Sequence, residues 1–321
     1  MKPSCLAAAA LSILLSQFAF AQPYPTAKPI TLVVPFPAGG GTDIVARLIA
    51  EKLREPLKTT VVVENKPGAS AQIGTKAVVD AAPDGYTLLV GTTSLINGPA
   101  LFGSKLPYDH NRQLRPVVSL ADLPIFLAVS TKHSAKTVKE FVDMAKKTPG
   151  LNYASAGPGT TLHMSSEWLK ANAGFDATHI PYKGSGQSVV SLGAGTVDFS
   201  MENLGPVLPM VQSGRVRILG VASHARDPHE PNVPTFREAG LPDVNLATWI
   251  FLMAPAATPD AVVSLLNRTT NEILRQPDTR EKLHAQGFVQ TGGTVDEMAA
   301  RMKAESVLWG TVIKNANIRI D

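Results

Sequence analysis

The stretch at residues 35–53, PFPAGGGTDIVARLIAEKL, decides how the fold of this chain is predicted. An apolar, β-branched run at residues 30–34 precedes it and is typical of a buried strand. Three glycines follow, and apolar residues then recur at helical spacing from Ile44 to Leu53. The order of strand, glycine turn and helix indicates an α/β unit.

The glycines Gly39, Gly40 and Gly41 allow the backbone to approach a ligand closely. The first N–H groups of the next helix have no partners within it, and together with the helix dipole they favour an anion. Nucleotide motifs fit poorly, because no lysine follows the glycines and the third glycine of a dinucleotide loop would fall at Ile44. Taken alone, the stretch is better explained by a tight turn with a side-chain cap on the helix, from Thr42 or from the residue after it.

The first 21 residues have the pattern of a secretory signal peptide. Lys2 gives a positive start, residues 6–20 are apolar, and an A-x-A cleavage site ends at Ala21. The apolar run is too short for a transmembrane helix, and no later stretch is long enough. Cys5 is the only cysteine and leaves with the leader. We therefore expect a periplasmic protein that begins near Gln22 and has no disulfide.

The 321 residues are 44% hydrophobic and 17% charged, which is ordinary for a globular chain long enough for two domains. The net charge of +4 is scattered. It slightly favours small anionic ligands and does not indicate a nucleic-acid partner.

Apolar runs alternate with helical patterns through most of the chain. The runs are apolar throughout rather than alternating, so both faces of each sheet should be covered, as in mostly parallel sheets flanked by helices. The expected strands cover residues 30–34, 60–63, 86–90, 125–129, 151–154, 177–180, 197–201, 216–221 and 249–253. Three helical stretches then follow with no strand between them, at residues 259–275, 279–286 and 294–313.

A final block of helices usually packs back onto an earlier layer. We therefore expect a discontinuous first domain, 22–124 plus 245–321, and an inserted second domain, 125–244. Two crossing strands would form a hinge, with a ligand cleft between the domains.

Three further loops follow the plan of the glycine loop. They lie at residues 91–97 (GTTSLIN), 155–161 (SAGPGTT) and 184–186 (GSG), each after an expected strand. Ligands of open α/β sheets bind outside the carboxyl ends of the strands. Two loops from each expected domain would thus offer bare N–H groups and hydroxyls to a small carboxylate.

The chain resembles the periplasmic solute receptors of tripartite tricarboxylate transporters, the Bug family. The signature P-[FY]-x-x-G-G-x-x-D matches residues 35–43, and the pattern continues in YASAGPGTTLH from Tyr153, in PYKG from Pro181, and in GTVD, GRVR, PDGYTLL and VPTFREAGLPDV. The resemblance runs from about Pro29 to the last helix. It implies a two-domain Venus-flytrap fold, binding of a small carboxylate through loop backbone and ordered water, and delivery to membrane permease subunits.

From the loops and the resemblance together we expect a monomer that binds its ligand without a cofactor or metal. The candidate ligand-binding residues are Phe36, Ala38, Gly39, Gly40, Asp43, Thr92, Thr93, Ser94, Ser155, Gly157, Thr160, Thr161, His163, Gly184, Ser185 and Glu202.

Several side chains in or beside these loops also have a purely structural explanation. Asp43 is either a helix cap or an acceptor for a ligand amine, water or loop N–H groups, and His163 either donates to the anion or packs. Lys183 could pair with a carboxylate or be solvated. Glu202 could select a ligand amine or hydroxyl or bond locally, and Phe36 could cover the ligand or belong to the core.

The enzyme alternatives have little support. The seven histidines form no H-x-x-x-H or H-E-x-x-H motif, and no G-x-S-x-G is present. We expect no catalytic residue, although a secreted hydrolase-like enzyme with a scattered triad, or an orphan receptor used for sensing, remains open. Dicarboxylates, tricarboxylates, aromatic acids and acidic amino acids are all compatible ligands.

Overall fold

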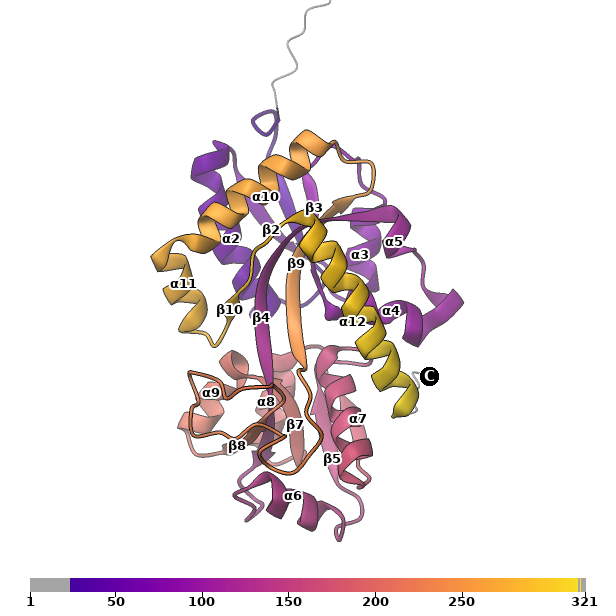
Figure 1. Cartoon of the computed structure of the whole chain (residues 1–321), viewed down its shortest axis with the longest axis vertical. Helices are drawn as coiled ribbons and strands as arrows, with labels where there is room; N and C mark the ends of the chain where they lie inside the picture. The colour runs from indigo at the N-terminus through magenta and orange to yellow at the C-terminus, as the bar shows by residue number, and fades with distance from the viewer. Residues whose placement is uncertain (1–23, 317, 319–321) are drawn as a thin grey trace, which may run out of the picture.

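The computed structural model describes residues 24–316 and 318. The expected leader, its cleavage site and Cys5 lie outside these residues. The described chain forms two α/β lobes stacked along its long axis, called upper and lower here as they stand in Figure 1. Within the described residues, no helix is both long and apolar enough to cross a bilayer.

The sheet of the upper lobe has the order β2-β1-β3-β9-β4, with β10 added beside β4. Its strands are β1 (Ile30–Val34), β2 (Val61–Asn65), β3 (Thr87–Thr92), β9 (Ala247–Pro255), β10 (Val289–Gln290) and the first part of β4 (Leu114–Ser130). Its helices are α2 (Gly41–Leu57), α3 (Gln72–Val79), α4 (Thr93–Phe102), the short η1 (Gly103–Lys105), α5 (His110–Gln113), α10 (Asp260–Arg275), α11 (Pro277–His284) and α12 (Val295–Asn315).

The sheet of the lower lobe has the order β4-β7-β5-β6, with β8 also paired to β4. Its strands are the second part of β4, β5 (Asn152–Ser155), β6 (Thr178–Pro181), β7 (Phe199–Asn203) and β8 (Val216–Val221). The helices α6 (Val138–Ala145), α7 (Thr161–Ala173), α8 (Ser185–Gly193) and α9 (Leu204–Gln212) flank it.

The outer strands of both sheets are parallel, as expected, whereas the central pairs are antiparallel. β1 is parallel to β2 and β3, and β5 to β6 and β7. β9 is antiparallel to β3 and β4, and β4 is antiparallel to β7 and β8. β4 leaves the upper sheet where Pro124 pairs with Ala247 and enters the lower sheet where Ile125 pairs with Asn203.

Both faces of the upper sheet are covered, which explains why its strands are apolar throughout. Leu32 of β1 packs in a core with α2 and α10, while the next residue, Val33, packs in a second core with α3, α4 and α12. Successive strand residues point to opposite faces, so two buried faces require apolar residues at every position.

Two expectations about the elements were wrong. The expected strand at 125–129 is only the end of the 17-residue β4, and the short β10 separates the final helices.

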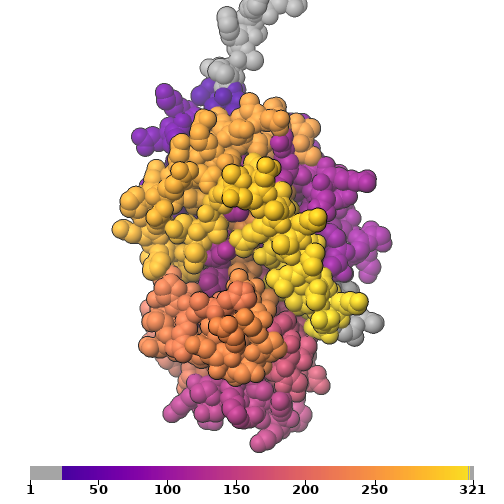
Figure 2. Space-filling view, viewed as in Figure 1, coloured from indigo at the N-terminus to yellow at the C-terminus, as the bar shows by residue number. Residues whose placement is uncertain are grey.

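The final helix, α12, packs against both lobes. Met298 packs in the upper lobe, but Trp309 and Ile313 pack in the core of the lower lobe, and α12 crosses the waist of the molecule in Figures 1 and 2.

Candidate functional site

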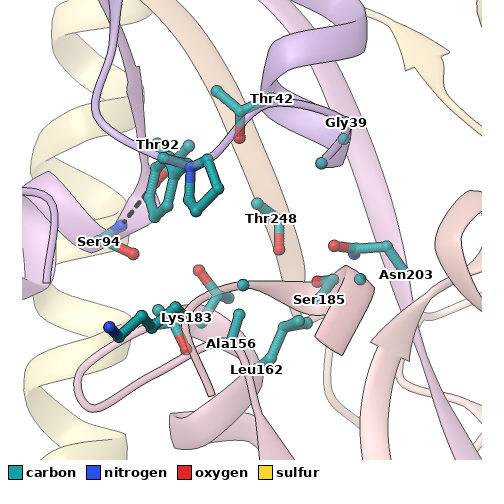
Figure 3. Close-up of a pocket in the computed structure, with 18 of the residues that line it drawn as sticks. Gly39, Thr42, Thr92, Ser94, Ala156, Leu162, Lys183, Ser185, Asn203 and Thr248 are labelled. Carbon is teal, nitrogen blue, oxygen red and sulfur yellow. Dashed lines mark hydrogen bonds between the residues drawn. The ribbon is translucent and has the colours of Figure 1, made fainter. Parts of the chain in front are cut away.

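A cavity of about 400 Å³ lies where the two lobes meet. Figure 3 shows Thr42, Thr92 and Ser94 on one side, Ala156, Leu162, Lys183 and Ser185 on the other, and Thr248 of β9 between them. The expected ligand residues that line the cavity are Phe36, Ala38, Gly39, Gly40, Thr92, Ser94, Thr160, Thr161, Gly184 and Ser185. Asp43, Thr93, Ser155, Gly157, His163 and Glu202 are not among its lining residues.

The helix α2 begins at Gly41, and its N-cap is Gly40, so neither Thr42 nor Asp43 provides the side-chain cap considered from the sequence. Gly39 has φ +82°, a conformation that favours glycine, and a Cβ there would meet no atom within 4 Å. At Gly40 a Cβ would meet only the carbonyl oxygen of Pro37, at 3.8 Å. The start of α2 therefore faces the cavity with bare backbone.

Asp43 does not line the cavity, but its carboxylate accepts hydrogen bonds that hold this loop. Its Oδ2 accepts from the Gly39 N–H and from Nε of Arg47, both at 2.9 Å, and its Oδ1 accepts from Nδ2 of Asn65 at 2.9 Å. Burial by itself would raise the pKa of Asp43, but these hydrogen bonds outweigh it and hold the pKa below its usual range. The local role of Asp43 thus uses both of its oxygens.

The start of α4 supplies hydroxyls from the same lobe. Thr92 is the N-cap and accepts from the Ser94 N–H at 3.3 Å, and both residues line the cavity. Thr93 instead points toward β9, where its hydroxyl accepts from the Trp249 N–H at 3.0 Å and donates to the Ala247 carbonyl at 3.4 Å. Thr93 therefore holds the first residues of β9 in place.

The start of α7 faces the cavity from the lower lobe. Thr160 is the N-cap, and its hydroxyl accepts from the His163 N–H at 3.4 Å and donates to the Gly157 carbonyl at 2.7 Å. The hydroxyl of Thr161 is buried and has no hydrogen-bond partner among the described residues. A buried polar group without a partner is costly, so this hydroxyl is available to a ligand.

His163 does not line the cavity, but it contacts the loop that precedes α7. Its Nδ1 accepts from the Gly159 N–H at 3.2 Å, and its ring stacks on His179 with the centroids 4.1 Å apart. Burial lowers the pKa of His163 to about 4, and burial together with the neighbouring His163 lowers the pKa of His179 to about 3. Both rings are therefore neutral near pH 7 and serve as packing groups.

Ser155 and His179 form a pairing that resembles a nucleophile and its base. Oγ of Ser155 lies 2.6 Å from Nε2 of His179, but Ser155 is fully buried and outside the cavity. The same Oγ also accepts from the Gly157 N–H at 3.1 Å. The pair holds the turn before α7 rather than facing a substrate.

The start of α8 completes the lower side. Gly184 is its N-cap at φ +133°, without a capping side chain, and Ser185 begins the helix. Lys183 is exposed, and in Figure 3 its side chain extends away from Asn203 along the lining of the cavity. Among the described lining residues it is the only charged one.

Eleven lining residues are absent from our candidate list. Eight of them lie in or directly beside the expected loops, namely Pro37, Gly41, Thr42, Ala156, Leu162, Lys183, Gly186 and Gln187, and the other three lie on strands. Leu123 of β4, Thr248 of β9 and Asn203 of β7 line the cavity. Nδ2 of Asn203 donates to the carbonyls of Leu123 and Pro124, at 3.0 and 3.2 Å, where β4 changes sheets. No sequence motif marks these positions, because their place depends on where β4 passes from the upper to the lower sheet.

The electrostatics of the cavity favour an anion. The starts of α2, α4, α7 and α8 all reach it, two from each lobe, and the amino end of a helix carries a partial positive charge. None of the described lining residues is acidic. Among the described residues, no group of three or more potential metal ligands occurs.

Comparison with known proteins gives a consistent result. Residues 45–318 match the model of the tripartite tricarboxylate transporter family receptor. The chain is 36% identical to protein BugT of Bordetella pertussis, over 94% of this chain and 92% of that protein.

Two solved structures are also similar. One is Rpa4515 of R. palustris with adipate, at 34% identity and TM-score 0.89, covering 92% of this chain and 99% of that chain. The other is MatC of Rhodopseudomonas palustris with bound malate, at 32% identity and TM-score 0.84, covering 89% of this chain and 99% of that chain.

Proposed function

We propose, from the premise that the chain belongs to the tripartite tricarboxylate transporter receptor family, that it is an exported periplasmic receptor for a small organic acid with two carboxylates. It would carry this ligand in the cavity between the lobes to the permease subunits of a tripartite transporter. The observation that carries the proposal is the convergence of four helix starts on a cavity that has no acidic lining residue.

The distribution of polar and apolar groups supports a ligand with a carboxylate at each end. Bare N–H groups and hydroxyls lie on both the upper and the lower side, and Phe36, Leu123 and Leu162 add apolar surface. The neighbours with adipate and malate each hold a dicarboxylate. Phosphate, by contrast, would leave the hydroxyls on one side unused.

The domain division belongs to the same proposal. The first domain would be 22–124 plus 245–321, the second 125–244, and cleavage of the leader would follow Ala21. The protein would act as a monomer without a cofactor and would release its ligand unchanged. A receptor used only for sensing is the second candidate, and it would share the same cavity.

A carboxylate screen tests the proposal. Purified mature protein is heated with adipate, malate, citrate, benzoate, glutamate or phosphate, and the hits are titrated by calorimetry. A ligand at a hundred times its Kd stabilises the folded state by about 2.7 kcal/mol, so a true ligand gives a clear rise in Tm. We expect a dicarboxylate to bind, phosphate not to bind, and chromatography to recover the acid unchanged. Binding of phosphate alone, or of no acid, would overturn the proposal.

A further inference from the structure

We propose that Glu202 is a positioning residue of the cavity, whose uncharged carboxyl accepts from Ser188 in the first turn of α8 and keeps the start of that helix free of negative charge beside the bound anion. This inference rests on the proposed function and adds a role for a residue that does not touch the ligand.

The surroundings of Glu202 are unusual for a carboxyl group. It lies in β7, opposite Phe126 of β4, and is completely buried. The hydroxyl of Ser188, in the first turns of α8, donates to its Oε1, while its Oε2 is buried without a hydrogen-bond partner in the described structure.

No charged side chain of the described residues compensates this carboxyl. Its polar neighbours are hydroxyls. Ser188 of α8 donates to it, while Ser185 of α8 and Ser200 of β7 lie close enough to oppose the rise of its pKa. A buried, unpaired carboxylate costs several kcal/mol, and such a group becomes protonated instead. Burial accordingly raises the pKa of Glu202 to about 8, against the opposing effect of the three hydroxyls.

The position of Glu202 couples its proton to the ligand. Ser185 is the first residue of α8 and lines the cavity, so the carboxyl lies directly behind the helix start that faces the anion. An ionised Glu202 would offset the positive end of the helix and repel the ligand. Ionisation of Glu202 and binding of an anion therefore oppose each other, and this coupling is reciprocal.

The sign of the pH effect follows from this coupling. Below the pKa of Glu202 the neutral form binds directly, and above it the protein must first take up a proton. The Kd of the wild type should therefore rise above about pH 8, approaching tenfold per pH unit.

The experiment is a calorimetric titration with adipate, which stays doubly ionised between about pH 6.5 and pH 9.5. The variants are Glu202→Gln, Glu202→Ala and Glu305→Gln. Glu305 is a matched control, because burial also raises its pKa but it lies on α12 outside the cavity. We expect Glu202→Gln to match the wild type at low pH, to bind more tightly than the wild type at high pH, and to take up no proton on binding. Glu202→Ala should bind weakly at every pH, and Glu305→Gln should follow the wild type.

A measurement without ligand provides a second readout. The pKa of Glu202 in the folded state lies above the unfolded value of 4.5, so its contribution to stability is complete below that value and is lost as pH rises toward about 8. The Tm of the wild type should fall relative to that of Glu202→Gln over this range.

The outcomes separate this inference from the proposed function. Tight adipate binding with no pH dependence, or tighter binding by Glu202→Gln at every pH, overturns the role of Glu202 and leaves the receptor function standing. If no carboxylic acid binds the wild type at about pH 6.5, both proposals fall.

Discussion

Gly40 leaves the N–H groups at the start of α2 open to the cavity because it has no side chain. Its φ is −80°, so other residues can adopt its backbone, and a Cβ there has space within the loop. We therefore predict that Gly40→Val leaves the Tm unchanged and raises the Kd for the ligand at least tenfold, or about 1.4 kcal/mol. The reason is that the added methyl groups enter the space beside the N–H groups of α2.

The control is Gly310→Val on α12, where a Cβ also meets no atom within 4 Å but lies outside the cavity. Titration calorimetry compares the two variants. An unchanged Kd for Gly40→Val would place the ligand elsewhere.

Thr161 offers the second test at this scale. Its buried hydroxyl has no partner in the described structure, so Thr161→Val should not lower the Tm, and it should weaken binding by about 0.5–1.5 kcal/mol through a lost hydrogen bond. Thr279→Val removes another buried, unpartnered hydroxyl on α11, outside the cavity, and should leave the Kd as it is. Equal affinities of both variants and the wild type would refute a ligand contact of Thr161.

Asp43 should act on stability rather than on the ligand. Its pKa in the folded state lies below the unfolded value of 3.8, so its contribution to stability is present above that value and is lost as pH falls through the folded-state pKa. Asp43→Asn should have a lower Tm than the wild type at neutral pH. The difference in Tm between the two proteins should become smaller in acid. A Tm series from about pH 7 to pH 2.5 measures this, and a large loss of affinity without a loss of Tm would instead indicate a direct ligand contact.

At the scale of elements, α12, β4 and β9 form one packed unit, joined by Arg301, Asp122 and Trp249. The guanidinium of Arg301 in α12 donates to both oxygens of Asp122 in β4, at 2.7 and 3.1 Å, and lies 4.2 Å from the ring centroid of Trp249 in β9. Because Asp122 is buried enough for its pKa to be raised despite Arg301, removing the arginine leaves a carboxyl without compensation.

We predict that Arg301→Ala lowers the free energy of unfolding by about 1–3 kcal/mol, less than for a fully buried pair because the side chains are 28% and 27% exposed. The added change Asp122→Asn should recover part of the loss. Arg237→Ala, which breaks an exposed contact to Asp243, should change stability by less than about 0.5 kcal/mol. Urea unfolding provides the measurement, and an unchanged midpoint for Arg301→Ala would exclude a structural role of this unit.

At the scale of the whole molecule, β4 runs through the sheets of both lobes, and α12 packs against both lobes. The cavity takes its lining from both lobes, so closure on a ligand should bring them together. We predict a smaller radius of gyration by small-angle X-ray scattering when the wild type is saturated with its acid. Gly40→Val at the same acid concentration should show no compaction. An unchanged radius for the saturated wild type would indicate a rigid site.

The local order of the fold could be predicted from the sequence because it depends on neighbouring residues. The apolar β-branched run 30–34 forms β1 at the expected bounds, and the glycine loop after it is followed by α2. The hydroxyl of Thr160 caps α7, which fits the general preference for threonine before the first turn of a helix. The glycine and hydroxyl loops that line the cavity were found in this way, since each follows the end of a strand.

Only the tertiary structure decided which side chains behind these loops face the cavity and which face the core. Glu202 and His163 were placed among the ligand residues because the family resemblance puts their segments at the cleft. In the fold, Glu202 lies beneath α8 and His163 stacks on His179, whereas Thr248, Asn203 and Leu123 reach the cavity without any motif. Sequence motifs depend on residues that are close in the chain. The direction of a strand residue depends instead on the register of β4 with β7 and β9, whose paired residues lie 70 to 141 positions away. The crossing of β4 between two sheets sets that register, and it becomes defined only when the whole chain has folded.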